Sequence, residues 1–382
     1  MRHHSVRWLL GTFILIFALV MWTPQGKGWV KTFLFIPQIL ESSPVKPQEF
    51  VTGTPVREKI KFPIAVGESE ADLYLPHGSG KHPAVLFYMG VVPPDRDEKR
   101  IVDLGNALAR SGVIVMIPWL RTQAENKIIE SDIDSLVKAF EYLKTMNRVD
   151  SNRVGMSGIC TGASMLAVAA QDSRISSNIK FLNFFAGYYD ATDLVRAVSS
   201  RTSFQKDEYR LWEPDKLTRS VLNQHLIEGV SDVRDRSILN RMFIQNEDMS
   251  NMQPIRLGPE GFATYQLISG VSLAETYDLI ENLSTSTTRF LKAISPSTNI
   301  HLLKTKMFIM HDRNDRLVPY EESLRFLENY NDPDKYHYTE FSLFQDAVQV
   351  HMDEDSELSA FRYSVELFKL IRHVYLIMRE LQ

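Results

Sequence analysis

The residues that most constrain the fold are 158–162, which read Gly-Ile-Cys-Thr-Gly and are called the elbow below. A short apolar run, Val154 to Ile159, leads into the elbow, and small and apolar residues from Ala163 to Ala170 follow it. The two glycines permit a tight turn and close packing of a strand on a helix. The pattern therefore predicts a strand, a sharp turn with Cys160 at its apex, and a helix directly behind it. Such a turn presents a single reactive side chain.

The rest of the chain alternates strands and helices around the elbow. The predicted strands are 59–66, 71–75, 84–88, 113–117, 154–159, 181–186, 307–310 and 338–344. The predicted helices are 101–108, 131–143, 163–170, 321–330 and 357–381. This alternation is typical of a mostly parallel sheet with helices on both faces.

The alternation stops near residue 195, and residues 200–290 carry helical patches with many charges and no clear strand. We interpret this region as an inserted helical cap. At 382 residues, the chain is long enough for one large domain with an insertion or for two domains. The expected segments are a membrane segment (1–40), a linker (41–57), the first part of the α/β core (58–198), the cap (199–290) and the second part of the core (291–382).

The N-terminus differs from the rest of the chain. Arg2 and Arg7 precede a charge-free run at 8–22, which is shorter than the ~20 residues of a bilayer-spanning helix. A basic leader before a short apolar run resembles a signal peptide, but residues 23–25 offer no small-x-small cleavage site. We predict an uncleaved signal-anchor with the globular part on the extracytoplasmic side; the alternative is secretion after cleavage. A second apolar patch at 29–40 either lies in the membrane interface or packs on the domain.

The composition excludes several classes of protein. With 44% hydrophobic and 24% charged residues, the chain is an ordinary globular protein. A net charge of −4 gives no bulk electrostatic basis for binding nucleic acid. One cysteine excludes an internal disulfide and a cysteine-based zinc site. We expect neither a metal nor an organic cofactor.

Two later segments offer partners for Cys160. Asp315 follows the predicted strand 307–310, and His351 follows the predicted strand 338–344. Reacting groups in open α/β sheets gather at the carboxyl ends of the strands, so all three side chains are expected at one edge. A thiol of pKa ~8.5 is mostly protonated at neutral pH, and the thiolate is the nucleophile. An imidazole would take the proton, and a carboxylate would hold the imidazole in the right tautomer.

A carbonyl substrate also needs donors for its oxyanion. The backbone N–H of Thr161, directly after the nucleophile, is the first predicted donor. The loop at Gly90 and Val91 is expected to supply the second, and the sequence leaves open which of the two residues does so.

Several residues compete for each role. Cysteine is often a buried filler, so Cys160 alone does not establish a site. Ser157 is expected within the strand and Ser164 one turn into the helix. The competing residues are His311 for the base, Asp312 and Asp346 for the acid, and Ser157 and Ser164 for the nucleophile.

The elbow resembles that of the dienelactone hydrolases, which carry a cysteine in Gly-x-Cys-x-Gly. The runs Leu-Tyr-Leu-Pro at 73–76 and Ile-Ser-Pro at 294–296 are similar to segments of the wider α/β-hydrolase superfamily. The resemblance covers roughly 58–195 and 290–380 and implies a Cys160, Asp315 and His351 triad. The loop at 88–91 reads Tyr-Met-Gly-Val where that family has a His-Glu pair.

The predicted architecture is an α/β-hydrolase fold: a mostly parallel central sheet flanked by helices, with an inserted helical cap and an N-terminal hydrophobic anchor helix. The predicted function is hydrolysis of a small-molecule carboxylic ester, lactone or thioester through an acyl-enzyme. The alternatives are an acyltransferase or acyl-thioester hydrolase, and a catalytically silent, membrane-tethered scaffold. Five apolar cap residues either line the substrate pocket or form the core of the cap: Trp212, Leu222, Leu226, Met242 and Phe243.

Overall fold

The computed structural model describes residues 23–40, 43–91, 95–247, 256–330, 332–342 and 360–382. Their main feature is an eight-stranded sheet of order β1-β2-β4-β3-β5-β6-β9-β10. β2 runs antiparallel to both of its neighbours, and all other pairs are parallel. The strands are β1 (Val56–Pro63), β2 (Glu68–Leu75), β3 (His82–Tyr88), β4 (Ile114–Trp119), β5 (Val149–Ile159), β6 (Leu182–Phe185), β9 (Met307–Asp312) and β10 (Tyr336–Phe341). The eight predicted strands are thus confirmed, with shifted ends.

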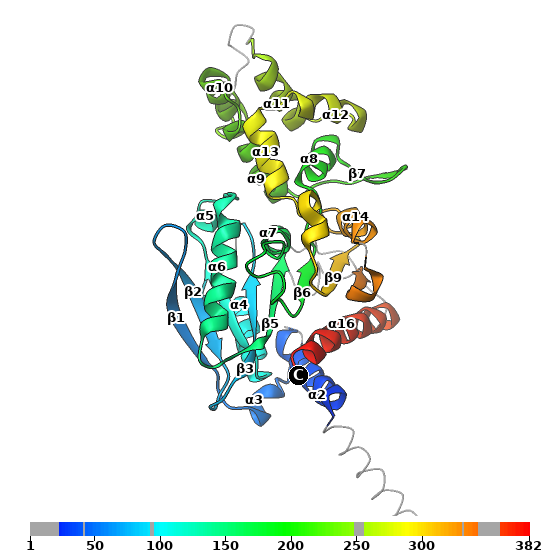
Figure 1. The fold of residues 1–382 in the computed structure, drawn as a ribbon. Coiled ribbons are helices and arrows are strands. Elements are labelled where there is room, and N and C mark those ends of the chain that lie inside the picture. Colours follow the sequence, from blue (N-terminus) through cyan, green and yellow to red (C-terminus); the bar gives the residue numbers. More distant parts are fainter. Residues whose placement is uncertain (1–22, 41–42, 92–94, 248–255, 331, 343–359) are drawn as a thin grey trace, which may run out of the picture.

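Helices cover both faces of the sheet (Figure 1). α6 (Ser131–Thr145) and α7 (Thr161–Ala169) lie on one face; α2 (Pro24–Ile39), α4 (Lys99–Arg110) and α16 (Ala360–Glu380) lie on the other. Each face has its own hydrophobic core: the first core lies under α6 and α7, and the second lies under α2, α4 and α16. Successive strand residues point to opposite faces, so Leu86 joins the first core, whereas Val85 and Phe87 join the second. Burial on both faces explains the continuous apolar run at 84–88.

The N-terminal helix α2 is part of the domain. Thr23 caps it by accepting a hydrogen bond from the Gly26 N–H (3.1 Å), and Phe35 and Ile36 are buried in the second core. Trp29 stacks on Tyr375 of α16 at 4.1 Å between ring centroids. Of the two placements considered for the patch at 29–40, the structure shows packing on the domain. The run at 1–22 lies outside the described residues.

In the part of the chain that the structure describes, no helix has both the length and the apolarity to cross a bilayer. The range expected as a linker, 41–57, includes the short helix α3 (Gln48–Val51) and the start of β1. Gln48 is buried there and donates to the Ala107 carbonyl of α4 (3.1 Å).

The inserted region stands above the carboxyl end of the sheet (Figure 1). It is mostly helical, but the antiparallel hairpin of β7 (Thr202–Gln205) and β8 (Glu208–Leu211) contradicts the expectation of no strand. Strands of four residues are too short to show a clear alternation in sequence. Its helices are α8 (Ala191–Ser200), α9 (Lys216–Glu228), α10 (Val233–Phe243), α11 (Pro259–Ser269), α12 (Leu273–Glu281) and α13 (Thr285–Ala293). The remaining elements are α5 (Arg121–Ala124), the 3-10 turns at Pro296–Leu302 and Pro333–Lys335, and α14 (Glu321–Asn329).

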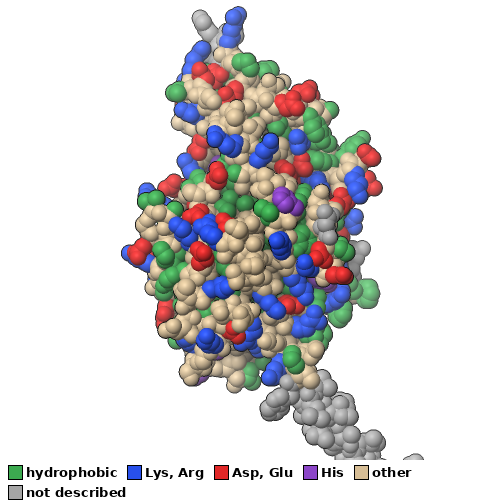
Figure 2. All heavy atoms as spheres, in the orientation of Figure 1, with side chains coloured by type: hydrophobic (Ala, Val, Ile, Leu, Met, Phe, Trp, Pro, Cys, Tyr) green, Lys and Arg blue, Asp and Glu red, His purple; other side chains and the backbone are tan. Residues whose placement is uncertain are grey.

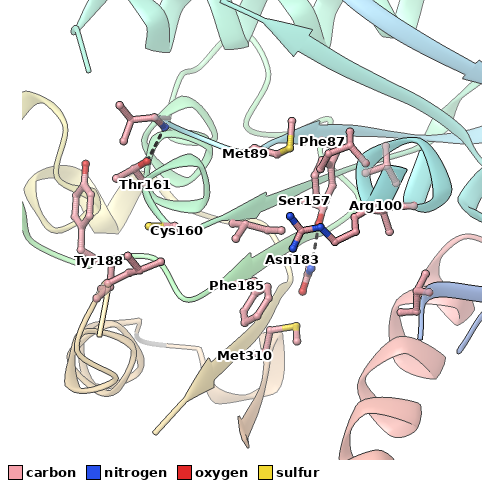
Figure 3. Close-up of a pocket in the computed structure, with 18 of the residues that line it drawn as sticks. Phe87, Met89, Arg100, Ser157, Cys160, Thr161, Asn183, Phe185, Tyr188 and Met310 are labelled. Atoms are coloured by element: carbon pink, nitrogen blue, oxygen red, sulfur yellow. Dashed lines mark hydrogen bonds between the residues drawn. The ribbon is translucent and has the colours of Figure 1, made fainter. Parts of the chain in front are cut away.

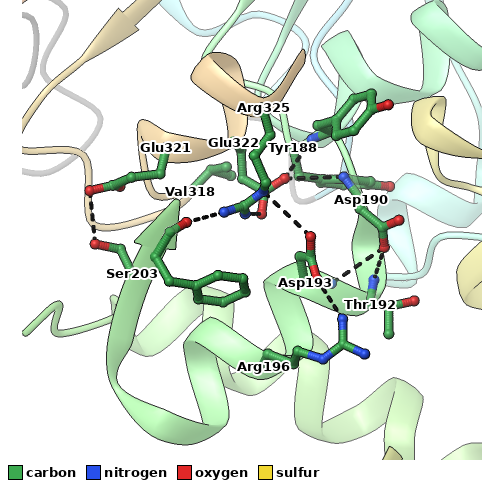
Figure 4. A network of polar contacts seen from close by, with 12 residues as sticks. Tyr188, Asp190, Thr192, Asp193, Arg196, Ser203, Val318, Glu321, Glu322 and Arg325 are labelled. Atoms are coloured by element: carbon green, nitrogen blue, oxygen red, sulfur yellow. Dashed lines mark hydrogen bonds and ion pairs between the residues drawn. The ribbon is translucent and has the colours of Figure 1, made fainter. Parts of the chain in front are cut away.

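A buried polar network joins α14 to the start of α8 (Figure 4). The fully buried Glu322 accepts hydrogen bonds from the backbone N–H groups of Tyr189 (2.8 Å) and Asp190 (3.1 Å). Arg325 forms an ion pair with Glu322 and lies 3.4 Å from Asp193. The network fixes the segment after β6, which leads from the sheet into the inserted region.

Acidic and basic side chains are interspersed over the face shown in Figure 2. This distribution matches the nearly balanced composition of the chain.

Candidate active site

Cys160 lies between β5 and α7, as the elbow predicts. Its φ of 53° and ψ of −132° are a conformation that a residue with a side chain rarely adopts. Such strain costs about 1–3 kcal/mol and is common at active sites. The Cys160 N–H donates to the Phe185 carbonyl of β6 (2.8 Å), which secures the turn against the neighbouring strand.

The glycines of the elbow are needed for close backbone contacts. A Cβ at Gly158 would lie 2.6 Å from the Cα of Ala163, inside α7. A Cβ at Gly162 would lie 2.5 Å from the backbone nitrogen of Gly90. The strand, the helix and the loop after β3 therefore meet closely enough to exclude any side chain.

Asp315 lies in the loop after β9 and is 7% exposed. Its Oδ1 accepts hydrogen bonds from the N–H groups of Leu317 (2.6 Å) and Val318 (3.1 Å), which hold the carboxylate in place. Trp212, from the inserted region, donates its indole N–H to the Asp315 carbonyl (2.7 Å). The charge of the Asp315 carboxylate contributes to the raised pKa of the Cys160 thiol, so the two predicted residues lie within electrostatic range of each other.

The predicted base, His351, and the competing acid Asp346 lie outside the described residues. The competing base His311 is fully buried, and both of its ring nitrogens are occupied. Nδ1 lies 2.7 Å from Ser323 Oγ and Nε2 lies 3.0 Å from the Val318 carbonyl. The carbonyl accepts only, so Nε2 carries the proton and Nδ1 accepts from the serine hydroxyl. His311 therefore has no free acceptor nitrogen for the thiol proton.

Asp312, Ser157 and Ser164 each have a structural role. Asp312 ends β9 and accepts the Asn314 N–H (2.8 Å). Ser157 lies within β5 and accepts a hydrogen bond from the Asn183 side-chain amide (3.0 Å). Ser164 is fully buried in α7 and donates to the Tyr188 carbonyl (2.8 Å). The expected positions of both serines are confirmed, and neither is at the apex of the turn.

The loop after β3 lies against the elbow, as the oxyanion prediction requires. Gly90 adopts a φ of 79°, and a Cβ there would lie 2.2 Å from Thr161 Oγ1. The Gln123 side chain donates to the Gly90 carbonyl (2.6 Å). However, the Val91 N–H donates to the Thr161 hydroxyl (3.0 Å). To act as an oxyanion donor, the Val91 N–H would therefore have to release the Thr161 hydroxyl and bind a substrate oxygen instead.

The surroundings of the thiol oppose its ionisation. Burial is the main cause and the Asp315 carboxylate is the second; together they raise the pKa of Cys160 to about 12, against a smaller opposing effect of the Thr161 N–H. At pH 7 a thiol of that pKa is ionised in about one molecule in 10⁵. A nucleophilic role for Cys160 therefore needs a base that takes the proton during the reaction.

A cavity of about 720 Å³ opens beside Cys160. Figure 3 shows Cys160 near Thr161 and Tyr188, with Phe185 and Met310 further along the cavity. Helices α9 and α13 of the inserted region contribute the opposite wall. Leu222 lines the cavity, as expected if the apolar cap residues face the substrate, whereas Phe243 packs against Tyr265 in the separate core of the cap.

Two residues of this cavity were not anticipated. Tyr188 is buried near Cys160 and donates its hydroxyl to the Ile294 carbonyl (3.2 Å). His225 of α9 accepts the Ile128 N–H at Nε2 (3.2 Å), so its neutral ring carries the proton on Nδ1. Burial lowers the pKa of His225, which keeps the ring neutral. No motif marks either residue, because each depends on how the insertion packs on the core.

No protein-family model matches the chain, and no curated protein matches it. Among solved structures, the acylaminoacyl peptidase of Pyrococcus horikoshii is 13% identical with a TM-score of 0.51, over 86% of this chain and 42% of that one. A 2,6-dihydroxy-pseudo-oxynicotine hydrolase is 11% identical with a TM-score of 0.50, over 86% of this chain and 68% of that one. The chain spans less than half the length of the acylaminoacyl peptidases it matches. Together with the strand order, these likenesses show that the chain has the α/β-hydrolase fold.

Proposed function

We propose that the protein is a hydrolase of carboxylic esters, lactones or thioesters that uses Cys160 as its nucleophile. The strained position of Cys160 at the apex of the elbow, beside Asp315 and at the wall of a cavity, is the observation that carries this proposal. His351 would complete the triad as the base. The fold of the neighbours in the comparison supports a reaction at this edge of the sheet.

The proposed reaction has two steps. His351 takes the thiol proton while the sulfur attacks the substrate carbonyl, which forms a C–S bond. The C–O bond of an ester, or the C–S bond of a thioester, then breaks, and the leaving group takes the proton from the imidazolium. In the second step water attacks the acyl-enzyme and gives one proton to His351, which passes it to the departing Cys160 sulfur.

Backbone donors would stabilise each tetrahedral oxyanion. The Thr161 N–H is the first, and we propose the Val91 N–H as the second, once it exchanges the Thr161 hydroxyl for the substrate oxygen. Asp315 has its Oδ1 occupied by two backbone N–H groups, and its Oδ2 lies 3.5 Å from Nε2 of His311. His351 would therefore have to approach Oδ2 beside His311.

The test compares turnover of short p-nitrophenyl esters by the wild-type protein and Cys160→Ala. We expect the variant to lose at least 10³-fold in kcat/KM, because no other nucleophile stands at the apex. Ser157→Ala is the matched control, since it removes a hydroxyl three residues earlier on the same strand, and it should retain activity within a few-fold. Equal rates for wild type and Cys160→Ala would reject the assignment.

The second candidate is a catalytically silent scaffold, and two observations favour it. The thiol pKa is raised to about 12, and the Val91 N–H is already engaged by the protein itself. This candidate predicts that Cys160 of the wild-type protein reacts with thiol reagents more slowly than free cysteine, whereas the hydrolase predicts a reaction at least as fast as that of free cysteine.

From the sequence of residues 1–22 we also propose an uncleaved membrane anchor with the globular part on the extracytoplasmic side. Protease treatment of intact and permeabilised cells tests it. Digestion of the domain only after permeabilisation would contradict the proposed side, and release of the domain without residues 1–22 would indicate cleavage.

A further inference from the structure

The cavity at Cys160 has a second branch, on the face of the sheet opposite α6 and α7. Its floor is formed by strand side chains that include Phe87, Ile159 and Phe185, and the helices α2, α4 and α16 cover it. We call this part the lower branch. Along the floor it extends from Phe185 to Phe181, four residues or about 13 Å of strand.

The lower branch belongs to a cavity that is too large to be a packing defect. Protein interiors contain few voids larger than a water molecule, whereas the whole cavity measures about 720 Å³. Cavities of this size are typical of ligand sites. Its walls are apolar side chains from three helices: Phe35 and Ile39 of α2, Leu104 and Leu108 of α4, and Val374 and Ile377 of α16.

The polar groups of the floor are already paired with one another. Asn183 donates to Ser157 (3.0 Å), and its carbonyl oxygen lies 3.0 Å from His373 Nε2. Nδ1 of His373 lies 2.9 Å from Thr339 Oγ1. Burial lowers the pKa of His373 to about 3, so the ring is neutral. A ligand in the lower branch therefore meets no charge and no unmatched donor from this group.

Charged side chains also line the cavity, and Figure 3 shows that of Arg100 pointing toward Ser157 and Asn183. These charged groups are paired. Lys99 forms an ion pair with Asp103, and Arg100 contacts Glu98 at 2.6 Å. Lys46 donates to three backbone carbonyls at the end of α2, at 2.8 to 3.2 Å. Since the apolar interior reaches Cys160 at the carboxyl edge, the lower branch fits an extended hydrocarbon chain with its polar end at the thiol.

We propose that the lower branch binds the unbranched hydrocarbon chain of a fatty-acyl ester or thioester whose carbonyl lies at Cys160. This rests on the proposed function for the covalent step, but the binding of the chain does not depend on it. The wall formed by α9 and α13 would then face the leaving group.

Binding is tested without catalysis, in the Cys160→Ala protein, with the fluorescent fatty acid cis-parinaric acid. Val374→Trp places a large side chain in the lower branch, and Val374→Ala is the matched control that widens it. We expect Val374→Trp to weaken binding at least tenfold and Val374→Ala to retain it. Leu104→Trp fills the same branch from α4, and it replaces Val374→Trp in the test if that variant does not fold. Unchanged binding in the folded tryptophan variants, or weakening by Leu222→Trp in α9 instead, would overturn the proposal.

Catalysis gives a second test with p-nitrophenyl esters of increasing acyl length. Burial of each methylene improves kcat/KM by about fourfold until the branch is full. Val374→Trp should end that increase at a shorter chain than in the wild-type protein. No turnover of any ester by the wild-type protein would reject the proposed hydrolase yet leave the binding result valid. Turnover with no dependence on chain length would reject the lower branch as the acyl site.

Discussion

Removal of the proposed base, in the variant His351→Ala, should slow the reaction of the Cys160 thiol with disulfide reagents, because the surroundings of the thiol oppose its ionisation. Burial and Asp315 raise the pKa of Cys160 to about 12, about three units above its ordinary value of 9.0. In His351→Ala no imidazole takes the thiol proton during the reaction, so this pKa sets the reactivity. The thiolate fraction at pH 7 then falls about 10³-fold. A more basic thiolate is also a better nucleophile, with a Brønsted slope of about 0.4–0.5, which recovers about 1.2 to 1.5 of the three logarithmic units. The net expectation is thiol–disulfide exchange about 30- to 60-fold slower than that of a free cysteine peptide.

The assay is the reaction of the only cysteine with 4,4′-dithiodipyridine, a small uncharged reagent, followed by the thiopyridone released. The wild-type protein should react at least as fast as the peptide. The rate for His351→Ala should rise about tenfold per pH unit between pH 7 and 9, because the thiolate fraction does. His301→Ala, at an exposed position, is the matched control and should behave as wild type.

If His351→Ala reacts as fast as wild type, His351 is not the base and the reasoning fails. His225→Ala tests the histidine that lines the same cavity. Its Nε2 already accepts a backbone N–H, so we expect no effect on the exchange rate. A slower rate in that variant alone would assign the role to His225.

Three further predictions concern stability. Gly162→Ala should lower the free energy of unfolding by about 1–3 kcal/mol, measured by urea denaturation, because its Cβ would lie 2.5 Å from the Gly90 nitrogen; a stabilised variant would contradict that contact. Glu322→Ala should cost about 3–5 kcal/mol by leaving Arg325 buried without its partner, and adding Arg325→Ala should cost less than the sum of the two single changes. Burial raises the pKa of Asp132 from 3.8 to about 6, so its contribution to stability is present below pH 4 and is lost as the pH rises through 6. Between pH 4 and 7, the free energy of unfolding of Asp132→Asn should therefore rise by about 3 kcal/mol relative to that of the wild-type protein. A difference that does not change with pH would contradict the raised pKa.

The sheet could be predicted from sequence because its signals are local. A continuous apolar run such as 84–88 indicates a strand buried on both faces, and Gly158 and Gly162 mark a turn that admits no side chain. That Asp315 lies within electrostatic range of Cys160 could be expected from a general rule, since both come after strands that end at the same edge. The hairpin at 202–211 lacked such a signal, and only the fold could show that the patch at 29–40 packs against α16.

The lower branch lay beyond prediction for a more basic reason. Apolar periodicity tells which face a side chain takes, but a helix that packs tightly on a sheet and one that leaves a hollow have the same pattern. Leu104 and Val374 would fall at the same positions of the apolar pattern in either case. The space between them depends on how α2 is placed beside α4 and α16, and that placement depends on pairs such as Trp29 on Tyr375 that are 346 residues apart (375 − 29). The turn at Cys160 is thus encoded within a few residues, whereas the shape of the lower branch is set by contacts between segments far apart in the sequence.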